Sequence, residues 1–173
     1  ITGAPAPTDT GGFYKTTDSS FHLRDTNEVA GGTEFWYQYG PGGSEWVPIA
    51  GDWDGDGIDT AGFYKTTDST FHLRNSNNLA GSTEFWFRYG PGGSEWAPIV
   101  GDWDGDNTDT AGLYRTTDSS FHLRNNNQLV GGTEFWYRYG PGGSEWAPIA
   151  GDWDGDGTDT VGLYRTTDSS FHL

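Results

Sequence analysis

Aromatic and aliphatic side chains alternate with polar ones in short runs along the chain, and no helical period is present. In residues 51–100, Phe71 and Leu73 fall on one side of an extended segment and His72 falls on the other. The Gly- and Pro-rich segment 90–94 is typical of a turn. Four runs in this stretch predict short strands, at 61–65, 71–74, 83–89 and 95–100. The pattern therefore predicts an all-β fold.

The same pattern returns every 50 residues without insertion or deletion. Residues 51–100 and 101–150 differ at 11 of 50 positions, and the chain divides into repeats 1–50, 51–100 and 101–150 and a half repeat, 151–173. Four strands in about 50 residues are typical of one β-propeller blade, and propellers have about four to eight blades. We therefore predict tandem four-stranded blades in a propeller-like row, either open or completed by a neighbouring chain.

An acidic stretch, Gly51 to Thr60, recurs at 101–110 and at 151–160. Its first three aspartates alternate with Trp and Gly, so a tightly curled loop would bring three carboxylates to one point, where they repel unless a cation lies among them. Oxygen ligands in a flexible loop suit Ca²⁺, which takes about six to eight oxygens. The sixth loop position needs a left-handed backbone. It is Gly57, Asn107 or Gly157, the residue types that adopt this conformation most readily.

Each loop offers one set of candidate calcium ligands. Three aspartates would give side-chain oxygens, the seventh residue its backbone carbonyl, and the last ligand would be the Asp at position eight or the Thr at position nine. The three sets are Asp52, Asp54, Asp56, Ile58, Asp59 and Thr60; Asp102, Asp104, Asp106, Thr108, Asp109 and Thr110; and Asp152, Asp154, Asp156, Thr158, Asp159 and Thr160.

About three Ca²⁺ ions per chain are therefore expected. An EF-hand would need Glu at position twelve, where this chain has Phe63, and no helix flanks the loop. The first repeat keeps only Asp9 and Thr10 of the motif, so we expect no metal there, and Pro5 and Pro7 predict an extended entry. We expect each acidic loop to join the last strand of one blade to the first strand of the next.

The segment 151–165, with Gly-Asp-Trp-Asp-Gly-Asp-Gly followed by Asp-Thr-Val-Gly-Leu-Tyr-Arg, resembles the FG-GAP/VCBS class of repeats in secreted bacterial proteins. Their Asp-x-Asp-x-Asp-Gly loops are similar to the calcium loops of integrin-type β-propellers. The resemblance covers the whole chain and implies a propeller-like fold and bound calcium. Many members of the class close the loop with an acidic residue at position nine, whereas this chain has Thr there and Asp at position eight.

The composition of the chain indicates which partners it is not expected to bind and where the protein is expected to be located. The chain has 173 residues, no Cys, 9 Trp and a net charge of −16. Such an acidic chain is not expected to bind nucleic acid or anionic membranes, and no apolar run is long enough to span a membrane. Without disulfides, stability must come from packing, metal or assembly. Calcium loops of this kind favour an extracellular or cell-surface location.

Several residues suggest other functions. His22, His72, His122 and His172 recur in Phe-His-Leu, once per copy, and are interpreted as structural or surface residues. Glu84 and Glu95 also have equivalents in other copies, whereas a glycosidase would need one asymmetric pair, so catalysis is not expected. Trp46, Trp96 and Trp146, next to the Gly-rich turn, are the candidates for a solvent-facing, sugar-binding set. The favoured function is a non-catalytic structural or adhesive module. The alternatives are a multivalent lectin-like module and the targeting domain of a secreted hydrolase.

The two ends of the chain are redundant, because residues 151–173 repeat what residues 1–23 supply. Two explanations are open. The strand pair 161–173 could dock on a neighbouring chain, which would make the protein self-associate into fibres. Alternatively, the chain is a fragment of a longer repeat protein.

Overall fold

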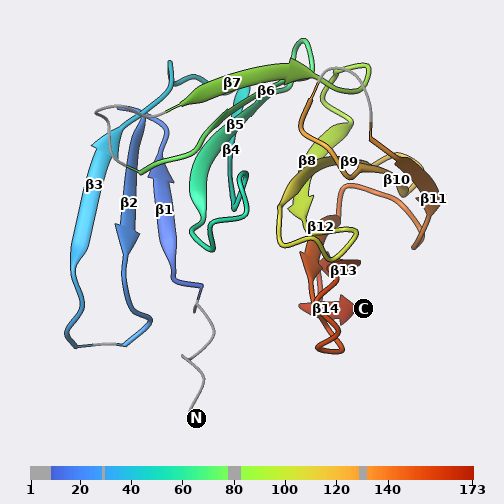
Figure 1. Cartoon of the computed structure of the whole chain (residues 1–173). Coiled ribbons are helices and arrows are strands. Elements are labelled where there is room, and N and C mark those ends of the chain that lie inside the picture. The colour runs from blue at the N-terminus through green and yellow to red at the C-terminus, as the bar shows by residue number, and fades with distance from the viewer. Residues whose placement is uncertain (1–8, 29, 78–82, 129–131) are drawn as a thin grey trace.

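The computed structural model describes residues 9–28, 30–77, 83–128 and 132–173, and this part of the chain contains strands and no helix. The expected extended entry at Pro5 and Pro7 lies outside the described residues. Four antiparallel sheets follow one another along the chain (Figure 1). The first sheet contains β1(Gly12–Lys15), β2(Ser20–Arg24) and β3(Glu34–Gln38), and the second contains β4(Trp46–Gly51), β5(Thr60–Lys65), β6(Thr70–Arg74) and β7(Glu84–Arg88). The third sheet contains β8(Trp96–Gly101), β9(Thr110–Arg115), β10(Ser120–Arg124) and β11(Glu134–Arg138), and the fourth contains β12(Trp146–Gly151), β13(Thr160–Arg165) and β14(Ser170–His172).

The predicted all-β fold of repeated, blade-like sheets is confirmed, and the four strands predicted in 51–100 are present within a residue or two. One expectation about their grouping is wrong. The acidic loop does not connect two sheets, because β4 pairs with β5 inside one sheet, with Gly51 opposite Thr60. Each sheet after the first therefore begins with the strand before an acidic loop, and the loop is the turn of a hairpin. The half repeat 151–173 forms β13 and β14, which complete a three-stranded sheet with β12.

The sheets pack face to face through aromatic side chains. We call the face of a sheet that contacts the next sheet in the chain its leading face, and the opposite one its trailing face. At the first joint, Phe21 and Tyr37 on the leading face of the first sheet are buried against Ala61 and Phe63 on the trailing face of the second. Phe21 and Phe63 meet edge to face with ring centroids 5.4 Å apart, a favourable geometry for aromatic pairs.

The same joint is built twice more from equivalent residues. At the second joint, the buried residues are Trp53, Tyr64, Phe71, Leu73 and Phe87 on the leading side and Trp96, Ala111 and Leu113 on the trailing side. At the third joint, they are Ile99, Trp103, Tyr114, Phe121 and Leu123 against Trp146, Val161 and Leu163. The core is therefore divided among the joints, as expected for a repeat protein in which each unit contacts its neighbours.

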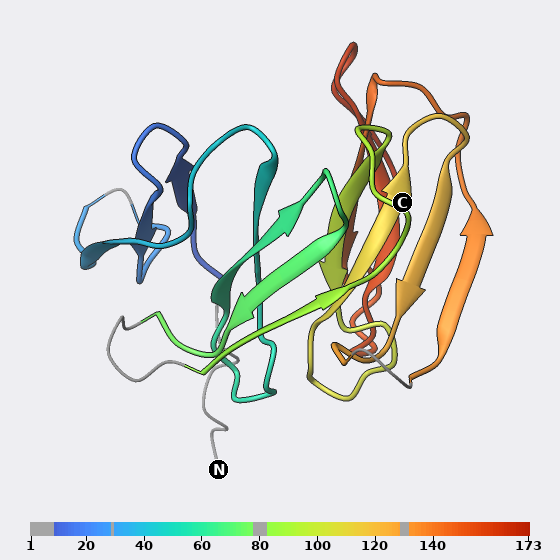
Figure 2. The same ribbon diagram turned by 90° about the horizontal axis from the view of Figure 1, so that it is seen from above.

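The four sheets follow an open arc. In Figure 1 the N-terminal sheet lies at the left and the C-terminal sheet at the lower right, with the second and third sheets above them, and Figure 2 shows the same order from above. The first strands of the second, third and fourth sheets lie side by side, with β8 between β4 and β12. The first sheet has no counterpart of that first strand among the described residues, and the last sheet has no counterpart of β7.

Candidate metal-binding loops

The acidic loops are closed hairpin turns organised by their first aspartate. One carboxylate oxygen of Asp52 accepts hydrogen bonds from the backbone N–H groups of Gly55 (2.8 Å) and Asp56 (3.1 Å), and the other accepts one from Gly57 (2.7 Å). Asp102 and Asp152 make the same set of bonds in their own loops. At Asp152 these backbone donors lower the pKa of the carboxyl group, led by Gly157. Each loop is therefore curled around the carboxylate of its first aspartate.

The backbone of the loop turns left-handed at two positions. The sixth position has φ values of 84°, 66° and 86° at Gly57, Asn107 and Gly157, which confirms the requirement inferred from the Gly/Asn exchange. The fourth position is also left-handed, with φ of 74° at Gly55 and Gly105. Sequence reasoning missed this second turn, although the signal was present, because the fourth position is Gly in all three loops.

The alternating aspartates do converge. In each loop the three side chains offer one carboxylate oxygen each, and these oxygens lie within 4.8 Å of one another; the groups are Asp52, Asp54 and Asp56; Asp102, Asp104 and Asp106; and Asp152, Asp154 and Asp156. Three carboxylates at this separation repel one another in the absence of a cation. A set of hard oxygen donors around one point fits a divalent metal ion. These groups can therefore hold a metal.

The aspartate at position eight, by contrast, binds the neighbouring loop. A carboxylate oxygen of Asp109 accepts a hydrogen bond from the backbone N–H of Asp52 (2.8 Å), and the backbone N–H of Asp109 donates to the carbonyl of Asp52 (2.8 Å). Asp159 makes the same pair of bonds to Asp102, at 3.0 and 2.7 Å. Each of these aspartates therefore ties its own sheet to the loop of the preceding sheet, a role that sequence reasoning did not foresee.

These linking carboxylates are crowded together. The pKa of Asp109 is raised from its usual value of 3.8 to about 7, chiefly by burial and also by the nearby carboxylates of Asp59, Asp159 and Asp52. The pKa values of Asp59 and Asp159 are also raised, with burial the largest cause and Asp9 among the contributing charges. One carboxylate from every repeat therefore contributes to a shared negative region.

The threonine at position nine has a structural partner. Buried Thr60 donates its hydroxyl to the backbone carbonyl of Arg74 (2.5 Å), and Thr110 does the same to Arg124 (2.6 Å). Both candidates for the last metal ligand therefore have protein partners. The Thr hydroxyl at position nine donates to a strand carbonyl in the second and third sheets. The Asp carboxylate at position eight bonds the preceding loop in the third and fourth sheets. Ile58, whose backbone carbonyl is the proposed metal ligand, has an exposed side chain. This exposure agrees with its replacement by Thr in the other two loops.

The expectation that Trp46, Trp96 and Trp146 face solvent is wrong. Trp96 and Trp146 are 7% and 5% exposed and belong to the joints, and Trp46 packs against the first joint. The reason is their place on the trailing face, where each indole also meets a histidine edge to face, as Trp46 does with His72 at 5.0 Å. The tryptophans that are most exposed are instead Trp36, Trp86 and Trp136 on the outer strands.

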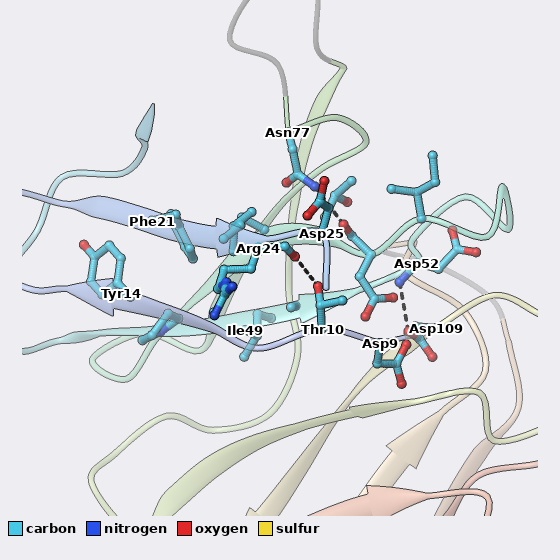
Figure 3. A pocket seen from close by; sticks show the side chains of 18 of the residues that line it. Asp9, Thr10, Tyr14, Phe21, Arg24, Asp25, Ile49, Asp52, Asn77 and Asp109 are labelled. Carbon is cyan, nitrogen blue, oxygen red and sulfur yellow. Dashed lines mark hydrogen bonds between the residues drawn. The ribbon is translucent and has the colours of Figure 1, made fainter. Parts of the chain in front are cut away.

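A cleft of about 700 Å³ lies between the first and second sheets (Figure 3). It is lined by β1, which has β2 on one side and no described strand on the other, and by Ile49 of β4. In the other sheets a first strand pairs along the corresponding edge. The cleft therefore lies along the edge of β1 for which the described residues supply no further strand. Asp52 and Asp109, which are joined by a hydrogen bond, also line the cleft.

Fold and site together define an all-β repeat protein with three acidic loops that can hold metal ions. Comparisons with models of known protein families, with curated proteins and with solved structures found no match. The resemblance to FG-GAP/VCBS repeats therefore remains a prediction from the motif. A search of the described residues found no helix with the length and apolar character needed to cross a membrane.

Proposed function

We propose that this chain is a calcium-stabilised, non-catalytic structural or adhesive repeat protein that works outside the cell or on its surface. The observation that carries the proposal is the convergence of three carboxylates in each of three equivalent hairpin loops. Carboxylate oxygens in a flexible loop suit calcium better than magnesium, which demands a near-octahedral site and keeps several waters. Asp52, Asp54 and Asp56 would hold one ion, with equivalent residues in the other two loops.

Calcium would act on stability through linkage. The loop places its three carboxylates together only in the folded chain, so an ion that binds them lowers the free energy of the folded state alone. Free calcium at about one hundred times the dissociation constant adds about 2.7 kcal/mol for each site. The repeats share packed joints, so this stabilisation would extend beyond the loop itself.

A structural role is supported by the equivalence of the repeats. His72, His122 and His172 each pack edge to face on the tryptophan at the start of their own sheet, with centroids 4.6–5.0 Å apart. The same side chains therefore make the same packing contacts in successive repeats. An enzyme would instead bring different groups together at one asymmetric place.

The test combines calorimetric titration with thermal unfolding. We expect about three calcium ions per chain and a melting temperature that falls when chelator is added. The double substitution Asp104→Asn and Asp106→Asn removes two ligands from one loop, and the stoichiometry should fall to about two. Glu134→Gln, at an exposed strand position, changes the charge outside the loops and serves as the control. Equal melting temperatures with calcium and with chelator would contradict the proposal.

A second candidate function is weak, multivalent carbohydrate binding. It is favoured by the three exposed tryptophans, one in each of the first three sheets, with Trp36 at 68%, Trp86 at 63% and Trp136 at 74% exposure. Flat indole rings suit the apolar faces of sugars, and repetition of a weak site gives avidity. A glycan array tests this candidate.

A further inference from the structure

The first aspartate of an acidic loop is held by the sheet that follows it. The N–H of Asp52 donates to a carboxylate oxygen of Asp109 (2.8 Å; Figure 3), and the carbonyl of Asp52 accepts a hydrogen bond from the N–H of Asp109 (2.8 Å). The side chain of the same Asp52 accepts the three N–H groups that curl its own loop. The residue around which this loop is built is therefore positioned from the third sheet.

A second contact joins the same two loops. A Cβ built on Gly55 would lie 3.1 Å from the hydroxyl oxygen of Thr108 and 3.4 Å from the carbonyl oxygen of Asn107. One sheet further on, a Cβ built on Gly105 would lie 3.1 Å from the hydroxyl oxygen of Thr158. The glycine at the fourth position of these loops therefore lies directly against the loop that follows.

The identity of the seventh loop residue follows the loop before it. Position seven is Thr108 or Thr158 in the two repeats that follow a repeat with all three converging aspartates. It is Ile58 in the repeat that follows the first one, where those aspartates are absent. A backbone carbonyl ligand at position seven places no requirement on the side chain, whereas a hydroxyl in contact with the preceding loop does. The contact between loops therefore accounts for this variation.

Within one loop, the residues that contact the preceding loop lie next to the converging carboxylates. Asp106 is one of the three converging aspartates, and its carboxylate accepts a hydrogen bond from the N–H of Thr108 (2.9 Å). Thr108 and Asp109 are the residues that reach the loop of Asp52. The bond equivalent to that between Asp106 and Thr108 is 2.8 Å long in the last loop. A candidate metal ligand and the contact to the neighbouring loop are therefore joined in one short segment.

We propose that Asp109 and Asp159 are positioning residues that couple each acidic loop to the one before it, so that calcium binding in one loop favours calcium binding in its neighbour. This inference rests on the proposed calcium binding and names how its sites act on one another. When Asp106 is fixed by an ion, the segment that bonds Asp52 is fixed with it, and Asp52 then presents its own loop already curled. Coupling between two binding sites is reciprocal, so the effect is equal in the other direction.

The first test disables one loop and follows its neighbour. The double substitution Asp154→Asn and Asp156→Asn removes two ligands from the last loop. It removes two carboxylate charges together with the two charges of the absent ion, so the formal charge equals that of the loaded loop and the field on the neighbour is matched. The backbone amides of Asn107 and Gly157 donate to the first aspartate of their own loops and report each loop in a calcium titration by nuclear magnetic resonance. We expect the calcium concentration at half saturation to rise at least about fivefold at Asn107.

The second test isolates the hydrogen bond between loops. Asp109→Ala removes the acceptor for the N–H of Asp52, and Asp109→Asn keeps an acceptor without the charge. The amide of Gly57, which donates to Asp52, reports the neighbouring loop. We expect Asp109→Ala to raise the half-saturation concentration at Gly57 at least about fivefold and Asp109→Asn to retain most of the affinity. Glu134→Ala removes a carboxylate from an exposed position of the same sheet and serves as the charge control, with no change expected at Gly57.

The outcomes separate this inference from folding and from the proposed function. Circular dichroism in saturating calcium establishes that each variant keeps its sheets. Unchanged half saturation at Gly57 in Asp109→Ala, and at Asn107 in the last-loop variant, would overturn the coupling and leave calcium binding intact. A change in Asp109→Ala that is confined to Asn107 would make Asp109 a ligand of its own loop and would also overturn the coupling. Wild-type amides that do not respond to calcium would overturn both proposals.

Discussion

Phe71 and Phe171 provide a matched pair for testing whether the joints hold the fold together. They occupy equivalent positions two repeats apart, but Phe71 is 0% exposed and Phe171 is 63% exposed. A phenylalanine buries on the order of 200 Å², so the difference in exposure corresponds to roughly 125 Å². At about 25 cal/mol per Å², Phe71 contributes about 3 kcal/mol more than Phe171 to the free energy of unfolding. The cavity left by truncation enlarges the gap, because Phe→Ala in a core typically costs about 3–5 kcal/mol.

The assay is urea unfolding of Phe71→Ala and Phe171→Ala, monitored by tryptophan fluorescence at one fixed, low protein concentration. We expect Phe71→Ala to lose about 3–5 kcal/mol and Phe171→Ala to lose no more than about a third of that. The slope of the free energy against urea reports whether the surface exposed on unfolding has changed. Equal losses for the two variants would refute the division of the core into joints with one uncovered end.

Two further predictions concern the linking aspartates and the exposed tryptophans. The folded pKa of Asp109, about 7, lies above its usual 3.8, so the stability that its protonation contributes is complete below about pH 4 and is lost as the pH rises through 7. Asp109→Asn, which keeps an acceptor for Asp52, should therefore raise the melting temperature of the calcium-free chain at pH 8 more than at pH 5; an equal effect at both would contradict the assigned pKa. On a glycan array, any specific binding by the wild type should fall at least tenfold when Trp86 and Trp136 are both changed to Ala, and survival of that binding would exclude this surface.

The strands and the loop conformation were predictable because they depend on local sequence. Alternation of large and polar side chains located all four strands of the second repeat, and the replacement of Gly57 by Asn107 identified a left-handed residue. The convergence of the first three aspartates of each loop follows from the same local curl. These features need no knowledge of how one sheet packs on the next.

What sequence reasoning missed depends on contacts between repeats. A periodic sequence can be divided into sheets at any turn, so the period alone did not reveal that β4 pairs with β5 across the acidic loop. The burial of Trp96 was missed for a related reason, since the trailing face of a sheet is covered only when the preceding sheet packs against it. The linking role of Asp109 likewise needs its partner, Asp52, which lies 57 residues earlier.

The acidic motif thus combines two functions that its spacing alone does not separate. Its first three aspartates gather within one loop, whereas Asp109 reaches back and bonds the backbone of Asp52, whose carboxylate belongs to the preceding loop. Asp109 therefore ties the third sheet to the acidic loop of the second sheet. The first repeat separates the two sets of residues, because it has lost the three converging aspartates and kept Asp9.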